Sequence, residues 1–133
     1  MGEFHEDDPI NPLTRRVIGA AITVHRFLGP GLLEKTYETC LAAELRHLGL
    51  QTECQVPVPV VYRDVQVDCA YRIDLLVERR LVVELKVAEA LAPVHTSQVL
   101  TYLRLAGLNV GLLLNFNVRI LPAGGIRRVF WQR

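Results

Sequence analysis

Two neighbouring apolar segments, each interrupted by an acidic residue, constrain the fold of this chain more than any other feature. Residues 72–77 and 81–87 have the length and composition of β-strands, and two arginines between them predict a tight turn. The segments are therefore expected to pair as a hairpin that brings Asp74 and Glu84 close together. Because successive side chains of a strand point to opposite faces, Glu84 and Lys86 should share one face while apolar residues occupy the other.

Two carboxylates and an ammonium group on a largely buried sheet destabilise it unless something compensates their charge. A hard divalent cation such as Mg²⁺ or Mn²⁺ would do so, because these ions favour oxygen ligands. The chain contains thirteen arginines and only two lysines, so Lys86 stands out as a compact ammonium suited to contact a water or a phosphate oxygen. A simple ion pair between Glu84 and Lys86 is the alternative, and these residues alone leave both interpretations open.

Length and composition indicate one globular domain. The chain has 133 residues, of which 50% are hydrophobic and 22% charged. No apolar run approaches the roughly 18 residues needed to span a membrane, and the acidic first eight residues do not resemble a signal peptide. Cys40, Cys54 and Cys69 are scattered without a CxxC pair, which argues against a zinc or iron–sulfur site. These features predict a cytoplasmic protein in a reducing compartment, with no membrane partner.

The net charge of +1 says nothing about nucleic acid by itself, but the charges are unevenly distributed. Four of the fourteen acidic residues lie in the first eight positions, which leaves fifteen basic and ten acidic side chains from Pro9 onward. Four arginines gather near the C-terminus, namely Arg119, Arg127, Arg128 and Arg133. This is a weak indication of phosphate binding, because arginine-rich termini are often only solvated.

The rest of the pattern predicts a flexible lead over residues 1–12 and a single domain over residues 13–133. Helical periodicity predicts a first helix capped by Asn11 or Thr14, and two more that each end at a glycine. The expected helices are 13–28, 32–48 and 94–106, and the expected strands are 55–62, 65–70, 71–78, 81–87, 110–116 and 126–131. Two prolines make the first of these an edge strand. The order predicts a mixed β-sheet flanked by helices, an α/β or α+β fold.

Several short motifs in this order carry a resemblance to a known family. Residues 31–37 fit the pattern GxxExxY, with Glu34 and Tyr37 at its defined positions. The match continues through Arg72-Ile73-Asp74, Glu84-Leu85-Lys86, Gln98 and Tyr102, and Asn115-Phe116. The chain resembles the GxxExxY family, which looks like a branch of the PD-(D/E)xK nuclease superfamily with its restriction-endonuclease-like core. Gln98 and Tyr102 also resemble the QxxxY motif of RecB-like and phage-exonuclease-like domains, and Ile73 replaces the usual proline.

The resemblance implies a role for each matching position. Asp74 and Glu84 would ligate Mg²⁺ or Mn²⁺ together with the backbone carbonyl of Leu85, and Glu34 would complete the acidic shell. Lys86 would position or help to deprotonate the attacking water. The nucleic-acid-binding residues would be Gln98, Tyr102 and Tyr37. For Glu34, a purely structural explanation also exists, because a carboxylate at a helix N-terminus is stabilised by the helix dipole.

The function implied is a divalent-metal-dependent nuclease that hydrolyses phosphodiester bonds in DNA, exonuclease-like or acting on single strands. Two alternatives stay open. One is a non-catalytic nucleic-acid-binding or regulatory module on the same fold, and the other is a Holliday-junction-type resolvase. The resolvase would have to be a dimer, so a homo-oligomer is also left open.

Overall fold

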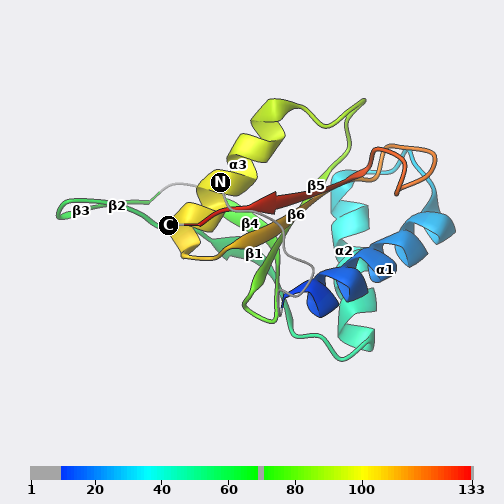
Figure 1. Cartoon of the computed structure of the whole chain (residues 1–133), viewed down its shortest axis with the longest axis horizontal. Helices are drawn as coiled ribbons and strands as arrows, with labels where there is room; N and C mark the ends of the chain where they lie inside the picture. Colours follow the sequence, from blue (N-terminus) through cyan, green and yellow to red (C-terminus); the bar gives the residue numbers. More distant parts are fainter. Residues whose placement is uncertain (1–9, 69–70, 133) are drawn as a thin grey trace.

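The structure, a computed structural model, describes residues 10–68 and 71–132 and contains a five-stranded sheet with helices on both faces (Figure 1). The strand order is β1-β4-β5-β6-β7, and β5 and β6 are parallel while the other neighbours are antiparallel. The helices are α1 (Asn11–Leu28), α2 (Glu34–His47) and α3 (Pro93–Ala106). The strands are β1 (Thr52–Pro57), β2 (Val60–Tyr62), β3 (Val65–Val67), β4 (Arg72–Val77), β5 (Leu81–Lys86), β6 (Val110–Asn115) and β7 (Ile126–Phe130). The predicted mixed sheet flanked by helices is confirmed.

Two apolar clusters hold the layers together, one on each face of the sheet. In β5, Leu81, Val83 and Leu85 pack with α1 and α2, whereas Val82 packs with α3. This alternation is the one expected from the sequence, because a strand buried on both faces sends successive side chains to opposite layers. The sheet is thus sandwiched between α1 and α2 on one side and α3 on the other (Figure 1).

The expected edge strand 55–62 is two separate strands in the structure. β1 is the edge of the five-stranded sheet and ends at Pro57, while Pro59 separates it from β2. The Val58 N–H still donates to the Tyr71 carbonyl at 2.9 Å, but Pro59 has no backbone N–H to donate, which explains why the strand pairing ends there. β2 and β3 pair only with each other and form a hairpin that projects away from the body of the molecule (Figure 1).

The first helix begins earlier than expected. It starts at Asn11, with Ile10 at the N-cap position, so neither Asn11 nor Thr14 is the cap. The Thr14 hydroxyl instead donates to the Ile10 carbonyl at 3.1 Å. Ile10 and Asn11 are buried, so the expected lead over residues 1–12 is wrong for its last part, and residues 1–9 lie outside the described chain. No helix in the described part of the chain is long and apolar enough to cross a membrane.

Glycine at position 111 lets α3 pack closely on β6, and this contact can be tested. A Cβ atom at Gly111 would lie 2.7 Å from Cγ1 of the fully buried Val99. Gly111→Ala should therefore destabilise the protein by about 1–3 kcal/mol in urea unfolding, because a packed core resists added volume. Gly19 in α1 has nothing within 4 Å of its added Cβ, so Gly19→Ala should stabilise by about 0.5–1 kcal/mol. Equal effects of the two substitutions would contradict this packing.

Candidate active site

The pairing of β4 and β5 stops one position before Asp74 and Glu84. The ladder runs from Val77 opposite Leu81 to Leu75 opposite Val83, and no pair follows it. Beyond that point the two carboxylates accept the backbone hydrogen bonds. The backbone N–H of Asp74 donates to Glu84 Oε1 at 2.9 Å, and the backbone N–H of Leu85 donates to Asp74 Oδ2 at 2.9 Å.

Each carboxylate is therefore fixed by the strand that carries the other one. Buried backbone N–H groups require an acceptor, and here side-chain oxygens take the place of ladder carbonyls. The structure brings Asp74 and Glu84 together at the opened end of the hairpin, as the two sequence segments predict. The backbone N–H of Leu85 contacts the Asp74 carboxylate at this end.

Asp74 also lies where the side chains of β4 stop alternating regularly between the two faces of the sheet. Leu75 and Val77 pack beneath α1 and α2, and strict alternation would place Ile73 with them. Ile73 packs instead in the cluster beneath α3. This break allows groups from both layers to act on Asp74, namely Glu38 of α2 and the residues of α3 described below.

A chain of polar contacts joins α2 to Asp74 through the edge strand. Gln55 of β1 donates through Nε2 to Asp74 Oδ1 at 3.2 Å and also to Glu38 Oε1. The other oxygen of the Glu38 carboxylate accepts a hydrogen bond from Lys35 Nζ at 2.7 Å. Neither Gln55 nor Glu38 belonged to the predicted site, although both reach it.

The electrostatics of the site favour bound protons over bare carboxylates. Glu84 is 2% exposed, and burial together with the nearby charge of Asp74 raises its pKa to about 9. Burial also raises the pKa of Asp74, and the backbone hydrogen bond from Leu85 opposes that shift. At Glu34, the exposed first residue of α2, partial desolvation and then the charge of Asp74 raise the pKa, while Lys86 lowers it. Desolvation is the largest cause at each of these acids, so a bound proton or cation is favoured there over a bare negative charge.

Lys86 does not provide the missing neutralisation. It is the last residue of β5, and its charge acts on both Glu34 and Glu84. Among residues 10–68 and 71–132, however, no carboxylate lies within ion-pair distance of its ammonium group. The ion pair between Glu84 and Lys86 that the sequence left open is therefore not formed, and the ammonium is available for another contact.

Asn115 fixes the course of the chain beyond Lys86. This fully buried residue at the end of β6 donates through Nδ2 to the Ala88 carbonyl at 2.9 Å and accepts from the Ala88 N–H at 3.1 Å. The backbone N–H of Phe116 donates to the Lys86 carbonyl at 3.0 Å. The end of β6 thus holds the backbone of Lys86 and of the residues that follow it, while the Lys86 ammonium makes no ion pair within the described chain.

Gln98 and Tyr102 approach the carboxylates from α3. Gln98 Nε2 donates to the Tyr102 hydroxyl at 3.2 Å, as expected for residues four apart on one helical face. Tyr102 is 5% exposed, and its pKa is raised by burial and by the charge of Glu84. Its ring belongs to the apolar cluster beneath α3, so only the hydroxyl end has a polar role.

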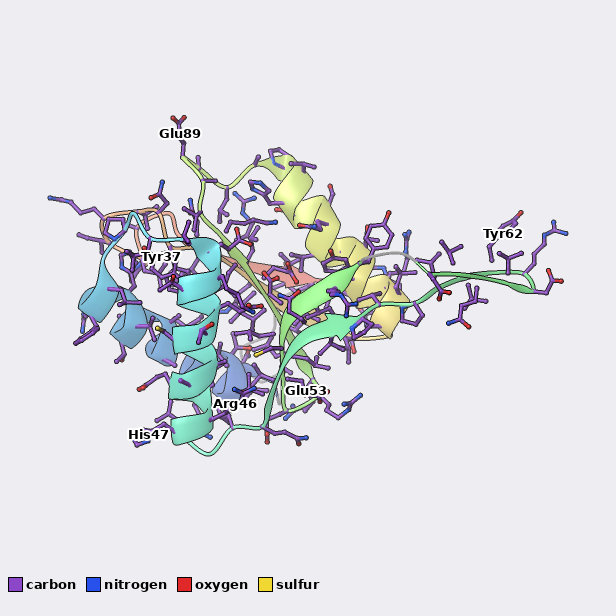
Figure 2. All side chains as sticks on the ribbon, turned by 180° about the vertical axis from the view of Figure 1, so that it is seen from behind. Tyr37, Arg46, His47, Glu53, Tyr62 and Glu89 are labelled. Atoms are coloured by element: carbon purple, nitrogen blue, oxygen red, sulfur yellow. The ribbon has the colours of Figure 1, made fainter. Side chains whose placement is uncertain are left out.

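The prediction that Tyr37 binds nucleic acid is wrong in this structure. The side chain, near the N-terminal end of α2 in Figure 2, is fully buried and stacks on Phe116 with ring centroids 4.6 Å apart. Its hydroxyl donates to the Gly29 carbonyl at 2.5 Å and accepts from the Leu32 N–H at 3.1 Å. Tyr37 therefore holds the loop between α1 and α2 and has no surface to offer to a substrate.

Comparison with known proteins places this arrangement in a family. A model described as the PD-(D/E)XK nuclease superfamily matches residues 11–129. The chain belongs to this superfamily. Neither a curated protein nor a solved structure matches it significantly. The proline of the PD-(D/E)XK motif is replaced by Ile73, which is buried in the cluster beneath α3.

PD-(D/E)XK nucleases typically use divalent metals, and the donor set of this chain fits a hard cation in its chemistry. Asp74, Glu84 and Glu34 would supply carboxylate oxygens, and the pKa of each is raised, first by desolvation and, at Glu84 and Glu34, next by the charge of Asp74. Within the described residues, no three His, Cys, Asp or Glu side chains are arranged to hold a metal. Mg²⁺ does not require such a cage, since it is usually held by one or two carboxylates and retains several waters. The Asp74–Glu84 pair meets that requirement.

The raised pKa of Glu84 predicts how stability depends on pH in the metal-free protein. The folded protein keeps this proton up to a pKa of about 9, whereas the ordinary value is 4.5. Between these values the unfolded chain binds fewer protons, so stability should fall as pH rises through this window. Glu84→Gln should flatten that slope and raise the free energy of unfolding at about pH 8 by on the order of 3 kcal/mol.

Urea unfolding in the presence of a chelator, from about pH 5 to about pH 9, measures this effect. Glu53→Gln is the matched control, because Glu53 lies on β1 outside the site and pairs with Arg79 at 2.6 Å. A wild-type slope in the Glu84→Gln protein would show that Glu84 does not retain its proton in the fold.

Proposed function

We propose that the chain is a divalent-metal-dependent nuclease that hydrolyses phosphodiester bonds in DNA. The observation that carries the proposal is the carboxylate pair of half-buried Asp74 and buried Glu84, near Lys86, whose ammonium makes no ion pair with any described residue. A purely structural site would be expected to neutralise its buried charges internally, because unpaired buried charge is strongly destabilising. This site instead concentrates acid at one point and leaves a cation next to it.

In this proposal Asp74 and Glu84 hold Mg²⁺ or Mn²⁺, with the Leu85 carbonyl and Glu34 as further ligands. When bound, the metal supplies a Lewis acid that lowers the pKa of a water and stabilises charge growing on the phosphate. Lys86 donates hydrogen bonds to the attacking water or to a phosphate oxygen. Because the carboxylates are already fixed by backbone N–H groups, little reorganisation is needed when the substrate binds.

The residues on α3 define the substrate side of the proposal. Gln98 has a hydrogen-bond-competent amide, and it contacts the Tyr102 hydroxyl, whose pKa the charge of Glu84 helps to raise. This pair would hold a substrate phosphate or orient Lys86. Its similarity to the QxxxY motif favours an exonuclease-like action or an action on single strands.

Replacement of Lys86 tests the catalytic assignment. Lys86→Ala should lower the cleavage rate by about 10³-fold, the size expected when a group that handles the proton is lost. Folding should be retained, because the ammonium makes no ion pair in the described chain. Labelled single- and double-stranded DNA incubated with Mg²⁺ or Mn²⁺ gives the rate. Arg80→Ala is the control, since Arg80 is an exposed cation in the turn that precedes β5.

The metal requirement is tested by binding without turnover. Mn²⁺ at about a hundredfold excess over its dissociation constant should stabilise the wild type by about 2.7 kcal/mol, measured as a rise in Tm. Asp74→Asn should abolish the rise, and a chelator should stop cleavage. The control Asp64→Asn changes an exposed aspartate in the turn between β2 and β3. An equal rise in Tm for Asp74→Asn and the wild type would exclude Asp74 as a ligand.

A non-catalytic binding or regulatory module is the second candidate. The net charge of +1 favours it, because the chain has little excess basic charge with which to grip DNA. DNA binding without cleavage in either metal would support this module. A resolvase would have to be a dimer in solution, which a mass measurement decides.

A further inference from the structure

Gln55 has a strained backbone inside a strand. Its φ of 52° is in the left-handed region, which a residue with a side chain rarely adopts. The other such residues that are not glycine, Arg63, Glu78 and Arg79, lie in turns of the described chain. Gln55 lies within β1, and the ladder with β4 lacks a pair at this position, opposite Asp74. Strain of this kind costs on the order of 1 kcal/mol and persists only where surrounding contacts enforce it.

The enforced conformation directs the Gln55 amide at two carboxylates. Its Nε2 donates to Asp74 Oδ1 at 3.2 Å and to Glu38 Oε1. An amide nitrogen has two N–H groups and no charge, so it can join two carboxylates without neutralising either. Both oxygens of Asp74 are then held, Oδ1 by Gln55 and Oδ2 by the Leu85 N–H.

Glu38 is the anchor of this contact. It is 3% exposed, although its charge raises the pKa of Asp74 and so opposes the ionised site. Its second oxygen is held by Lys35 at 2.7 Å. The proposed reaction has no use for Glu38 itself. Its position is explained by its contact with Gln55, whose amide it keeps turned towards Asp74.

We propose that Gln55, anchored by Glu38, is a positioning residue that fixes the carboxylate of Asp74 for a divalent cation. This inference rests on the proposed function, because it concerns how the same cation is held. Gln55 acts through Asp74 and does not itself touch the metal or the substrate. Residues that orient a metal ligand typically change metal affinity or activity by about 10- to 100-fold when they are replaced.

Two replacements separate positioning from support of the fold. Gln55→Met keeps the bulk of the side chain and removes both donors. Gln55→Gly also removes the donors but relieves the backbone strain, so it should fold without loss of stability. Glu53→Gln is the control on the same strand, because Glu53 pairs with Arg79 away from the site. Glu38→Leu removes the anchor and should change metal affinity in the same direction as the two Gln55 variants.

Mn²⁺ affinity, measured by the free-Mn²⁺ EPR signal, is read alongside Tm in chelator. Both Gln55 variants should bind Mn²⁺ about 10- to 100-fold more weakly, with the Tm of Gln55→Gly preserved and Glu53→Gln unchanged. Affinities within about twofold of wild type would overturn the positioning role while the nuclease proposal stands. If Mn²⁺ affinity falls only in variants whose Tm also falls, the positioning role is overturned as well, and Gln55 has a structural role instead. If the wild type itself binds no Mn²⁺, both proposals fail together.

Discussion

The reciprocal hydrogen bonds between Asp74 and Glu84 are the constraint on which the site depends. A β-hairpin normally closes through carbonyl acceptors, but here the ladder ends early and two carboxylates accept the N–H groups of the opposite strands. The opened strand ends stay ordered because their polar groups remain satisfied. The same two bonds bring the half-buried Asp74 and the buried Glu84 together, and a bound proton or cation makes this pairing favourable.

The rest of the fold supplies the surroundings that keep this end open. Tyr37 stacks on Phe116 and fastens the loop before α2, so that the start of that helix lies near the carboxylates. Asn115 clamps the chain after Lys86, and the close approach of α3 at Gly111 sets the position of Tyr102. Parts of the chain that are distant in sequence therefore converge on the unpaired end of the β4–β5 hairpin. Stability and site geometry have the same physical origin in this protein.

The sequence predicted the features that follow from strand periodicity. The hairpin that joins Asp74 to Glu84 could be inferred from its period-two pattern and the strand β6 from its continuous apolar run. The order of the elements then predicted the mixed sheet. Helical periodicity also placed Tyr37 correctly on α2, but it could not show that the loop before the helix would cover the ring. A residue on the right face of a helix was therefore given the wrong role.

Gln55 shows a different limit. Its contact with Asp74 depends on a left-handed backbone within a strand, and the first polar residue of an alternating run gives no sign of such a conformation. Glu38 was visible one turn after Glu34, yet the sequence could not show which carboxylate would be buried. Contacts made through a break in regular structure are not encoded in its periodicity, so only the folded arrangement reveals them.

The projecting hairpin of β2 and β3 contributes no residue of its strands to either apolar cluster. Folding free energy comes mainly from buried apolar surface, so this arm adds little to the integrity of the domain. Its length and composition are consequently under few of the demands that govern the sheet. Evolution or an engineer can reshape this appendage while the interior and the acidic centre keep their form.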